Sequence, residues 1–268
     1  MEVKDKVIIV TGGGNGMGRE IVFNLLEKGS KVVALDINDK ALEETSKLAG
    51  IWADSLMTVK TDITNKEALQ ELPEKIAGKF GAIDGLINNA GIIQPFRRVN
   101  DTDFETIDRV FNINFFGSLN AIKVFLPHLL KRPEAHIVNV SSMGGFMPVT
   151  GQAIYGASKA ALKILSEGLA SELTDTRVRV TTAFPGAMAT NIKTNSGLSS
   201  DAKIEQERQA GKNPALSPAI AADMIVTAIE SNKQRIYIGK DAQTMNLLYK
   251  FMPKMAVKFI HKSMKDKI

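Results

Sequence analysis

A tyrosine and a lysine one helical turn apart are the residues of this chain with the clearest chemical potential. They bound the run "YGASK", Tyr155 to Lys159, and residues four apart share one face of a helix. A free phenol has a pKa of about 10 and is a poor base at neutral pH. An ammonium group beside it favours the phenolate, so the spacing predicts a lowered pKa for Tyr155 and a role in proton exchange. The same spacing also occurs by chance on solvated helices, so the rest of the chain must support the interpretation.

The composition excludes several other kinds of chemistry. The chain has 268 residues and no cysteine, which rules out disulfides and cysteine nucleophiles. Its three histidines, at 128, 136 and 261, are too widely spaced to form a metal-binding motif. No run approaches the roughly 18 apolar residues of a membrane span, and the N-terminus lacks a signal-peptide pattern. We therefore expect a cytoplasmic protein without a metal site.

The elements that must position Tyr155 and Lys159 are short apolar runs alternating with longer amphipathic stretches. The predicted strands span 6–11, 31–36, 56–61, 83–88, 135–140, 177–183 and 235–239. Helical patterns lie between them, including 18–29, 65–81 and 155–173. Apolar strands separated by helices predict an α/β protein, a single doubly wound Rossmann-type parallel sheet with helices on both faces, over residues 1–240. The polar stretch 187–218 has no strand signal and is the predicted lid.

A glycine-rich turn, "TGGGNGMG", follows the first predicted strand and opens the first helix. Glycines there let the backbone approach a pyrophosphate, with the spacing Gly12-x-x-x-Gly16-x-Gly18 in place of G-x-G-x-x-G. Asp36 ends the next strand, where a carboxylate can accept hydrogen bonds from adenosine ribose hydroxyls and would repel a 2′-phosphate. The sequence therefore predicts NAD over NADP. Two alternatives stay open: Arg19 could reach a phosphate, and Asp36 could be a turn or capping residue.

Taken together, the motifs resemble the short-chain dehydrogenase/reductase family from Lys4 to Gly239. Six matches carry the resemblance: T-G-x-x-x-G-x-G at 11–18, N-N-A-G at 88–91, N-x-x-G at 114–117, Ser142 thirteen residues before the tyrosine, Y-x-x-x-K at 155–159, and P-G at 185–186 with Thr190 beyond it. Each match is modest alone, and their shared order and spacing make the assignment specific.

The resemblance implies a role for each matched residue. Tyr155 takes the proton of an alcohol while hydride passes to nicotinamide, or donates it to a ketone in reverse. Ser142 orients the substrate oxygen, Lys159 holds the nicotinamide ribose, and Asn114 holds a water that links Lys159 to solvent. The implied cofactor contacts are Gly12, Asn15, Gly16, Met17, Gly18, Asp36, Asp62, Ile63, Asn89, Tyr155, Lys159 and Thr190, with Asp62 and Ile63 at the adenine.

Several of these positions have competitors. Ser141 competes with Ser142, and Asn112 competes with Asn114. Asp62 could instead cap the helix that follows it. The asparagines at 88 and 89 could simply cap the end of a strand.

Apolar side chains near these motifs predict a pocket for a hydrophobic secondary alcohol or ketone of steroid, acyl or aryl type. The candidates are Phe96, Met143, Phe146, Met147, Val149, Met188 and Ile192, of which several could be core residues instead. Other functions stay open: an NADP-dependent ketone or 3-oxoacyl reductase, a non-catalytic NAD-binding protein, or a membrane-surface interaction protein. The resemblance also implies a homodimer or homotetramer, paired through helices at about 103–130 and 155–173.

The excess positive charge is confined to the end of the chain. Residues 240–268 carry seven lysines and two aspartates, a balance that equals the net charge of +5 of the whole chain. A basic surface for nucleic acid is therefore not expected. On a helix, Lys250, Lys254, Lys258, Lys262 and Lys265 fall opposite Met252, Met255, Phe259, Ile260 and Met264, with a kink expected at Pro253. This pattern predicts an amphipathic C-terminal extension, 241–268, that packs over the pocket or a partner subunit, or touches an anionic membrane.

Overall fold

Seven parallel strands form one sheet. The computed structural model describes residues 1–188, 196 and 216–265. The strand order is β3-β2-β1-β4-β5-β6-β7. The strands are β1 (Val7–Thr11), β2 (Lys31–Asp36), β3 (Leu56–Lys60), β4 (Gly85–Asn88), β5 (Ala135–Val140), β6 (Val178–Pro185) and β7 (Arg235–Ile238). All seven predicted strands are present, with ends that differ from the prediction by no more than two residues.

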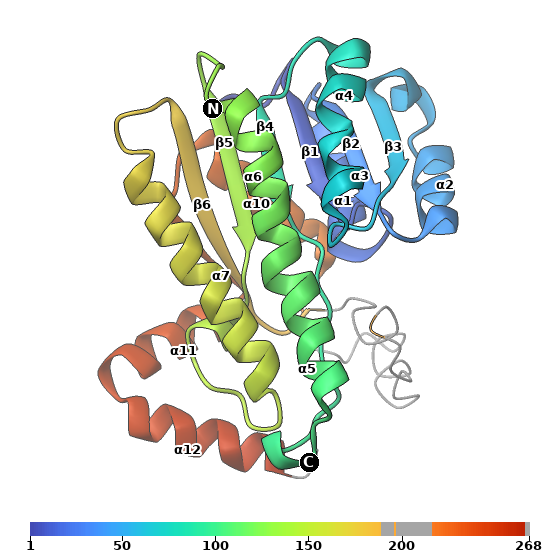
Figure 1. Cartoon of the computed structure of the whole chain (residues 1–268). Coiled ribbons are helices and arrows are strands. Elements are labelled where there is room, and N and C mark those ends of the chain that lie inside the picture. Colours follow the sequence, from blue (N-terminus) through green and yellow to red (C-terminus); the bar gives the residue numbers. More distant parts are fainter. Residues whose placement is uncertain (189–195, 197–215, 266–268) are drawn as a thin grey trace.

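Helices cover both faces of the sheet, as predicted (Figure 1). On one face lie α1 (Gly16–Glu27) and α10 (Pro218–Glu230), and on the other α4 (Leu72–Phe80), α6 (Ser118–Leu129) and α7 (Ala153–Glu172). Alternation along β1 places Ile8 and Val10 in the first core and Val7 and Ile9 in the second. The strands are therefore apolar throughout because both of their faces are covered.

The single helix predicted over 65–81 is two helices, α3 (Lys66–Gln70) and α4. Pro73 lies in the first turn of α4, where its missing N–H costs nothing and its fixed φ suits a helix start. The N-cap of α3 is Asn65, whose side chain accepts a hydrogen bond from the Ala68 N–H. The alternative interpretation of Asp62 as the cap of this helix is therefore wrong.

The strand order reverses between β1 and β4, so the loops after these two strands lead to opposite faces of the sheet. A crevice opens at the carboxyl ends of the strands at this point. The loop into α1 borders it on one side. On the other lie α7 and a π-helical turn at Asn112–Gly117, which follows α5 (Phe104–Phe111). Most of the predicted lid lies outside the described residues, and so do Thr190 and Ile192.

The C-terminal extension forms two helices, α11 (Lys240–Phe251) and α12 (Pro253–Met264), and Pro253 begins the second helix instead of kinking one long helix. Figure 1 shows both beyond the carboxyl ends of the strands. Met245, Ala256 and Ile260 are buried and form a small core with Met147. Of the apolar face expected in the extension, only Ile260 is buried and Met264 partly so, whereas Met252, Met255 and Phe259 are exposed. Within the described residues, no helix is long and apolar enough to cross a membrane.

Candidate active site

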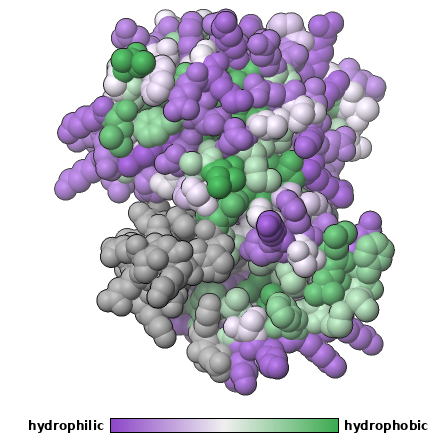
Figure 2. Space-filling model, turned by 180° about the vertical axis from the view of Figure 1, so that it is seen from behind, coloured by the Kyte–Doolittle hydropathy of each residue, from purple (hydrophilic) through white to green (hydrophobic). Residues whose placement is uncertain are grey.

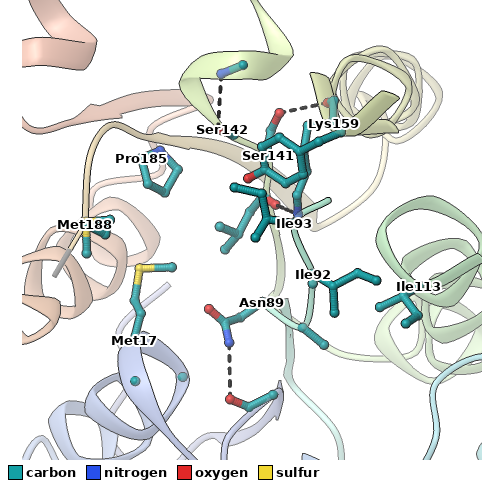
Figure 3. Close-up of a pocket in the computed structure, with 18 of the residues that line it drawn as sticks. Met17, Asn89, Ile92, Ile93, Ile113, Ser141, Ser142, Lys159, Pro185 and Met188 are labelled. Atoms are coloured by element: carbon teal, nitrogen blue, oxygen red, sulfur yellow. Dashed lines mark hydrogen bonds between the residues drawn. The ribbon is translucent and has the colours of Figure 1, made fainter. Parts of the chain in front are cut away.

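The loop after β1 is held in place by the end of β4. Gly12 and Gly16 have φ angles of 68° and 52°, a conformation that favours glycine. The Thr11 hydroxyl accepts hydrogen bonds from the Asn89 and Ala90 N–H groups, each at 3.0 Å. The Asn89 side chain donates to the Thr11 and Gly12 carbonyls at 3.0 and 3.3 Å, and one of these bonds is drawn in Figure 3. Asn89 therefore fixes the shape of the glycine loop.

Close approach, and not flexibility, explains the third glycine of the motif. A Cβ at Gly18 would run into the Gly12 carbonyl oxygen and the Asn89 side chain. The loop can therefore fold back over the start of α1 only if residue 18 is glycine. This geometry leaves the N-terminus of α1 at the edge of the crevice, where its backbone N–H groups favour an anion.

A cavity of ≈ 520 Å³ occupies the crevice and joins the glycine loop to the tyrosine and lysine of α7. In Figure 3, Met17 and Met188 border it on one side, and Ile92, Ile93 and Ile113 on another. Of the twelve predicted cofactor contacts, all but Thr190 line this cavity, and Thr190 lies outside the described residues.

Two glycines bring Ser142 next to Tyr155. A Cβ at Gly145 would strike the Ser141 hydroxyl and the Lys159 carbonyl, and a Cβ at Gly156 would lie 2.9 Å from the Gly144 carbonyl oxygen. The turn after β5 can therefore rest directly on α7, which brings the side chain of Ser142 close to the phenol of Tyr155. Both serines line the cavity, but the Ser141 hydroxyl donates to the Lys159 carbonyl at 2.8 Å and is buried, which favours Ser142 as the serine whose hydroxyl is available to a substrate.

The pKa of Tyr155 is raised, which is opposite to the predicted direction. Burial away from water raises this pKa, and the nearby Ser142 hydroxyl opposes the rise. Lys159 is itself buried, and burial lowers the pKa of its ammonium to about 8. The Lys159 Nζ donates to the Val140 carbonyl at 2.9 Å. The prediction failed because it counted the charge of the lysine and not the burial of both groups.

Asn114 lies in the π-helical turn, whose wider backbone ring is often found at functional sites. Its Nδ2 donates to the Ile92 carbonyl and the Ser158 hydroxyl at 3.0 and 3.1 Å, and its Oδ1 accepts from the Ile92 N–H at 2.8 Å. One acceptor site on Oδ1 remains, so the predicted role on a water is still a prediction. Asn112 is exposed, whereas Asn114 is buried, which favours Asn114 of the two.

Asp36 lines the cavity beside the glycine loop. Its oxygens accept from the Gly14 and Asn38 N–H groups at 3.0 and 2.9 Å, and Asn38, not Asp36, caps the helix that follows. Arg19 is held elsewhere by Glu44 at 2.6 Å and by the Gly14 carbonyl at 2.9 Å. These contacts occupy the guanidinium of Arg19, which does not line the cavity.

Asp62 and Ile63 complete the same end of the cavity. The Asp62 Oδ1 accepts from the Thr64 N–H and hydroxyl, each at 2.8 Å, which forms a tight polar turn. Ile63 packs against the backbone of Gly117, where a Cβ would overlap its side chain. The glycine of the N-x-x-G motif is therefore required by the position of Ile63.

The predicted substrate residues divide into two groups. Phe96, Met143, Val149 and Met188 line the cavity. Phe146 and Met147 do not: Phe146 makes edge contacts with Phe184 and Tyr237 at 5.5 Å each, and Met147 is buried against the C-terminal helices. These two side chains pack between elements, so the prediction that they face the substrate is wrong.

Three functional candidates carried no sequence signal. The Gln94 Oε1 accepts from the Tyr155 N–H at 2.8 Å and so anchors the first turn of α7. Gln152 lines the cavity with a buried Oε1 that has no partner among the described residues. The Asp241 Oδ2 accepts from the Ala187 N–H at 2.6 Å and holds the turn after Pro185 against α11. The contacts of Gln94 and Asp241 join residues far apart in the chain, which spacing cannot reveal.

Comparison with known proteins agrees with this geometry. The sequence model of the family described as short chain dehydrogenase matches residues 6–200. The chain belongs to the short-chain dehydrogenase/reductase family. It is 31% identical to SadH of Mycobacterium tuberculosis, a protein named as an oxidoreductase, over 92% of this chain and 91% of that one. It is 35% identical to an uncharacterised oxidoreductase of Staphylococcus saprophyticus, over 76% and 88% of the two chains.

Solved structures of short-chain dehydrogenases share the fold. One, from Burkholderia phymatum in complex with NAD, has a TM-score of 0.80 and 26% identity and covers 88% of this chain and 90% of its own. Another, from Burkholderia cenocepacia in complex with NADP, has a TM-score of 0.81 and 26% identity over 97% and 99%. The protein is thus an oxidoreductase of a family whose solved members include complexes with either dinucleotide.

Proposed function

We propose that this oxidoreductase transfers a hydride between NAD(H) and a hydrophobic secondary alcohol or ketone. The observation that carries the proposal is the Tyr155 hydroxyl, close to Ser142 and one helical turn from a buried Lys159, at the wall of a cavity that the glycine loop also lines. Acid/base, orienting and cationic groups thus meet where a dinucleotide and a small substrate would lie together.

The residues present fit a dinucleotide. The glycine loop exposes backbone N–H groups at the start of α1, and the space that a Cβ at Gly12 or Gly18 would fill is already occupied by neighbouring backbone and Asn89. Asp36, Asp62 and Ile63 would hold the adenosine, and Lys159 the nicotinamide ribose. When bound, the nicotinamide supplies the hydride acceptor or donor.

Tyr155 and Ser142 would manage the proton at the substrate oxygen. Because burial raises the pKa of Tyr155, the phenol keeps its proton near neutral pH, and this is the form that donates to a ketone oxygen. Ser142 would donate a second hydrogen bond to that oxygen and orient it. A Lys159 whose pKa is about 8 is still mostly protonated at pH 7, so it would supply a positive charge beside the nicotinamide ribose. This arrangement favours ketone reduction at neutral pH and alcohol oxidation at higher pH.

NAD is the favoured dinucleotide because a carboxylate stands where a 2′-phosphate would lie. The carboxylate of Asp36 is fixed by two backbone N–H groups, and Arg19 is paired with Glu44. A phosphate placed near Asp36 would meet a negative charge without a free arginine beside it.

An apolar substrate is favoured by the remaining walls of the cavity. Phe96, Met143, Val149 and Met188 contribute apolar side chains, and Ile92, Ile93 and Ile113 extend this lining. The buried Gln152 Oε1 offers one acceptor that could fix the orientation of a polar group on the substrate.

A homodimer or homotetramer is the proposed assembly. Phe104, Phe116, Leu130 and Ile164 are large apolar side chains with 46% to 84% exposure. They lie on or beside the helices through which the family resemblance implies pairing. Burial of these side chains between subunits would remove apolar area from water.

The test is turnover by the purified protein with a panel of apolar ketones, followed by the loss of NADH absorbance. Tyr155→Phe keeps the ring and removes the hydroxyl, so we expect turnover to fall by about 10²-fold or more with NADH binding largely retained. Lys159→Ala should lose both turnover and NADH affinity. Binding is measured by quenching of Trp52, the one tryptophan of the chain. Retention of turnover in Tyr155→Phe would refute the assigned role of the hydroxyl.

A further inference from the structure

The two C-terminal helices present a group of exposed apolar side chains. Its members are Leu247, Phe251, Met252, Met255 and Phe259, which are 47% to 72% exposed, and we call this group the C-terminal apolar surface. Figure 2 shows hydrophobic side chains gathered at the lower right of the molecule, the region of the C-terminal helices. Exposed apolar residues are ordinary when scattered, whereas a contiguous group marks a contact surface.

These side chains are not needed to attach the helices to the protein. Attachment uses another face, on which Ala256 and Ile260 are 0% and 4% exposed and pack with Met245 and Met147. Ala256, Ile260 and the partly buried Met264 follow one another at intervals of four and form one stripe along α12. α12 therefore has a face packed on the enzyme and a separate apolar stripe in water, which runs from Met252 through Met255 to Phe259.

A third stripe along α12 is basic. Lys254, Lys258 and Lys262 are spaced four residues apart and are exposed. At 100° per residue, this stripe lies beside Met255 and on the far side of the apolar stripe from Ile260. Between residues 242 and 265 the chain has five lysines and no acidic residue. No described carboxylate lies within ion-pair distance of Lys254, Lys258 or Lys262.

We propose that α11 and α12 form a docking face for an anionic lipid bilayer. The C-terminal apolar surface would enter the boundary between headgroups and acyl chains, and the lysines beside it would meet lipid phosphates. A second copy of this chain is a poorer occupant, because two such faces would bring unpaired lysines together. The proposal concerns an interaction surface and does not depend on the reaction proposed above.

Vesicle sedimentation tests the proposal with the full chain. One set of vesicles contains phosphatidylcholine alone, and the other equal parts of phosphatidylcholine and phosphatidylglycerol. We expect binding to the anionic vesicles, weak binding to the neutral ones, and a loss of binding as salt is added.

Two variants remove the positive charge and the apolar area of the docking face separately. Lys254→Gln with Lys258→Gln should weaken binding about fivefold per lysine, the equivalent of about 1 kcal/mol for each charge near an anionic surface. Phe259→Ser should weaken it about tenfold or more, the equivalent of the roughly 1.5–3 kcal/mol from burying a phenylalanine. Matched controls lie far from the C-terminal helices in the sequence. They are Ile51→Ser, at a residue that is 91% exposed in the short helix Gly50–Ser55, and Lys47→Gln, at an exposed lysine of α2 (Asp39–Leu48).

Three outcomes would overturn the proposal. The first is absence of wild-type binding to anionic vesicles. The second is an equal loss of binding in the control variants. The third is a Phe259→Ser protein that changes its mass in sedimentation equilibrium while its vesicle binding is unchanged, which would assign the surface to a subunit contact. The lysine pair removes no apolar contact, so it keeps the test decisive if Phe259→Ser lowers the urea midpoint.

Discussion

Removal of the charge of Asp36 should change the dinucleotide preference, and Asp36→Asn is the smallest change that does so. The variant keeps the size of the side chain and one oxygen acceptor. It can accept from the Gly14 N–H or from the Asn38 N–H, but not from both as the carboxylate does. Because both bonds are at least partly exposed to water, we expect only a modest fall in the free energy of unfolding, of about 1 kcal/mol.

The size of the effect on preference follows from Coulomb's law. Two unit charges 4 Å apart repel by about 1 kcal/mol in water and by about 4 kcal/mol at the effective dielectric constant near a protein surface. Asp36 is partly exposed, so the lower part of this range applies. We therefore expect the ratio of kcat/KM for NADPH to that for NADH to rise about tenfold to a hundredfold in Asp36→Asn.

A second substitution tests the ion pair between Arg19 and Glu44. Glu44→Gln removes the charge that holds the Arg19 guanidinium at 2.6 Å. In the Asp36→Asn background, this change should raise NADPH use further, because Arg19 loses its charged partner and keeps only neutral ones. Asp39→Asn is the matched control: it removes a carboxylate three residues away, at an exposed position that does not line the cavity.

Initial rates with both dinucleotides and one ketone provide the measurement. If Asp39→Asn shifts the preference as much as Asp36→Asn, the effect is one of net charge and the assigned contact is wrong. If the wild type uses NADPH as efficiently as NADH, the charge of Asp36 does not disfavour the 2′-phosphate.

The sheet and most of the cavity could be predicted from local patterns. Strands buried on both faces are continuous runs of valine and isoleucine, so each leaves an unambiguous signal in the sequence. The glycine loop and the pair formed by Tyr155 and Lys159 are equally local, because one turn of backbone fixes their geometry. In contrast, the helix predicted over 65–81 has Pro73 in its interior, whereas Pro73 lies in the first turn of α4. A proline in a first turn and a proline in an interior look alike when the helix boundary is unknown.

Features set by packing between distant segments could not be predicted. Apolarity marked Phe146 and Met147 as buried, but only the tertiary structure shows that they pack on β6, β7 and the C-terminal helices and not on the cavity. The raised pKa of Tyr155 has the same origin, because desolvation depends on everything that surrounds the phenol. In the C-terminal extension, alternation could not separate the stripe of Ile260, which is buried, from that of Phe259, which is exposed.

Two further predictions test the loop and the core. Gly18→Ala should lower the free energy of unfolding by about 1–3 kcal/mol and weaken NADH binding, because the new Cβ meets the Gly12 carbonyl. Gly78→Ala, in a helix with open space around it, should instead stabilise the protein by about 0.5–1 kcal/mol; equal urea midpoints for the two would contradict this. The second prediction concerns His136, whose pKa burial lowers from 6.5 to about 3. Its Nε2 lies 2.8 Å from the Thr181 hydroxyl, which itself donates to the Lys233 carbonyl, so Nε2 carries the proton of the neutral ring. As pH falls from 6.5 toward 3, the unfolded chain therefore takes up a second ring proton that the folded protein does not, and stability is lost at about 1.4 kcal/mol per pH unit in that window. Urea unfolding at pH 7.5 and pH 5 should show a loss of stability that is about 2 kcal/mol smaller in His136→Gln than in the wild type. The same loss in both proteins would mean that His136 does not remain neutral in the folded state.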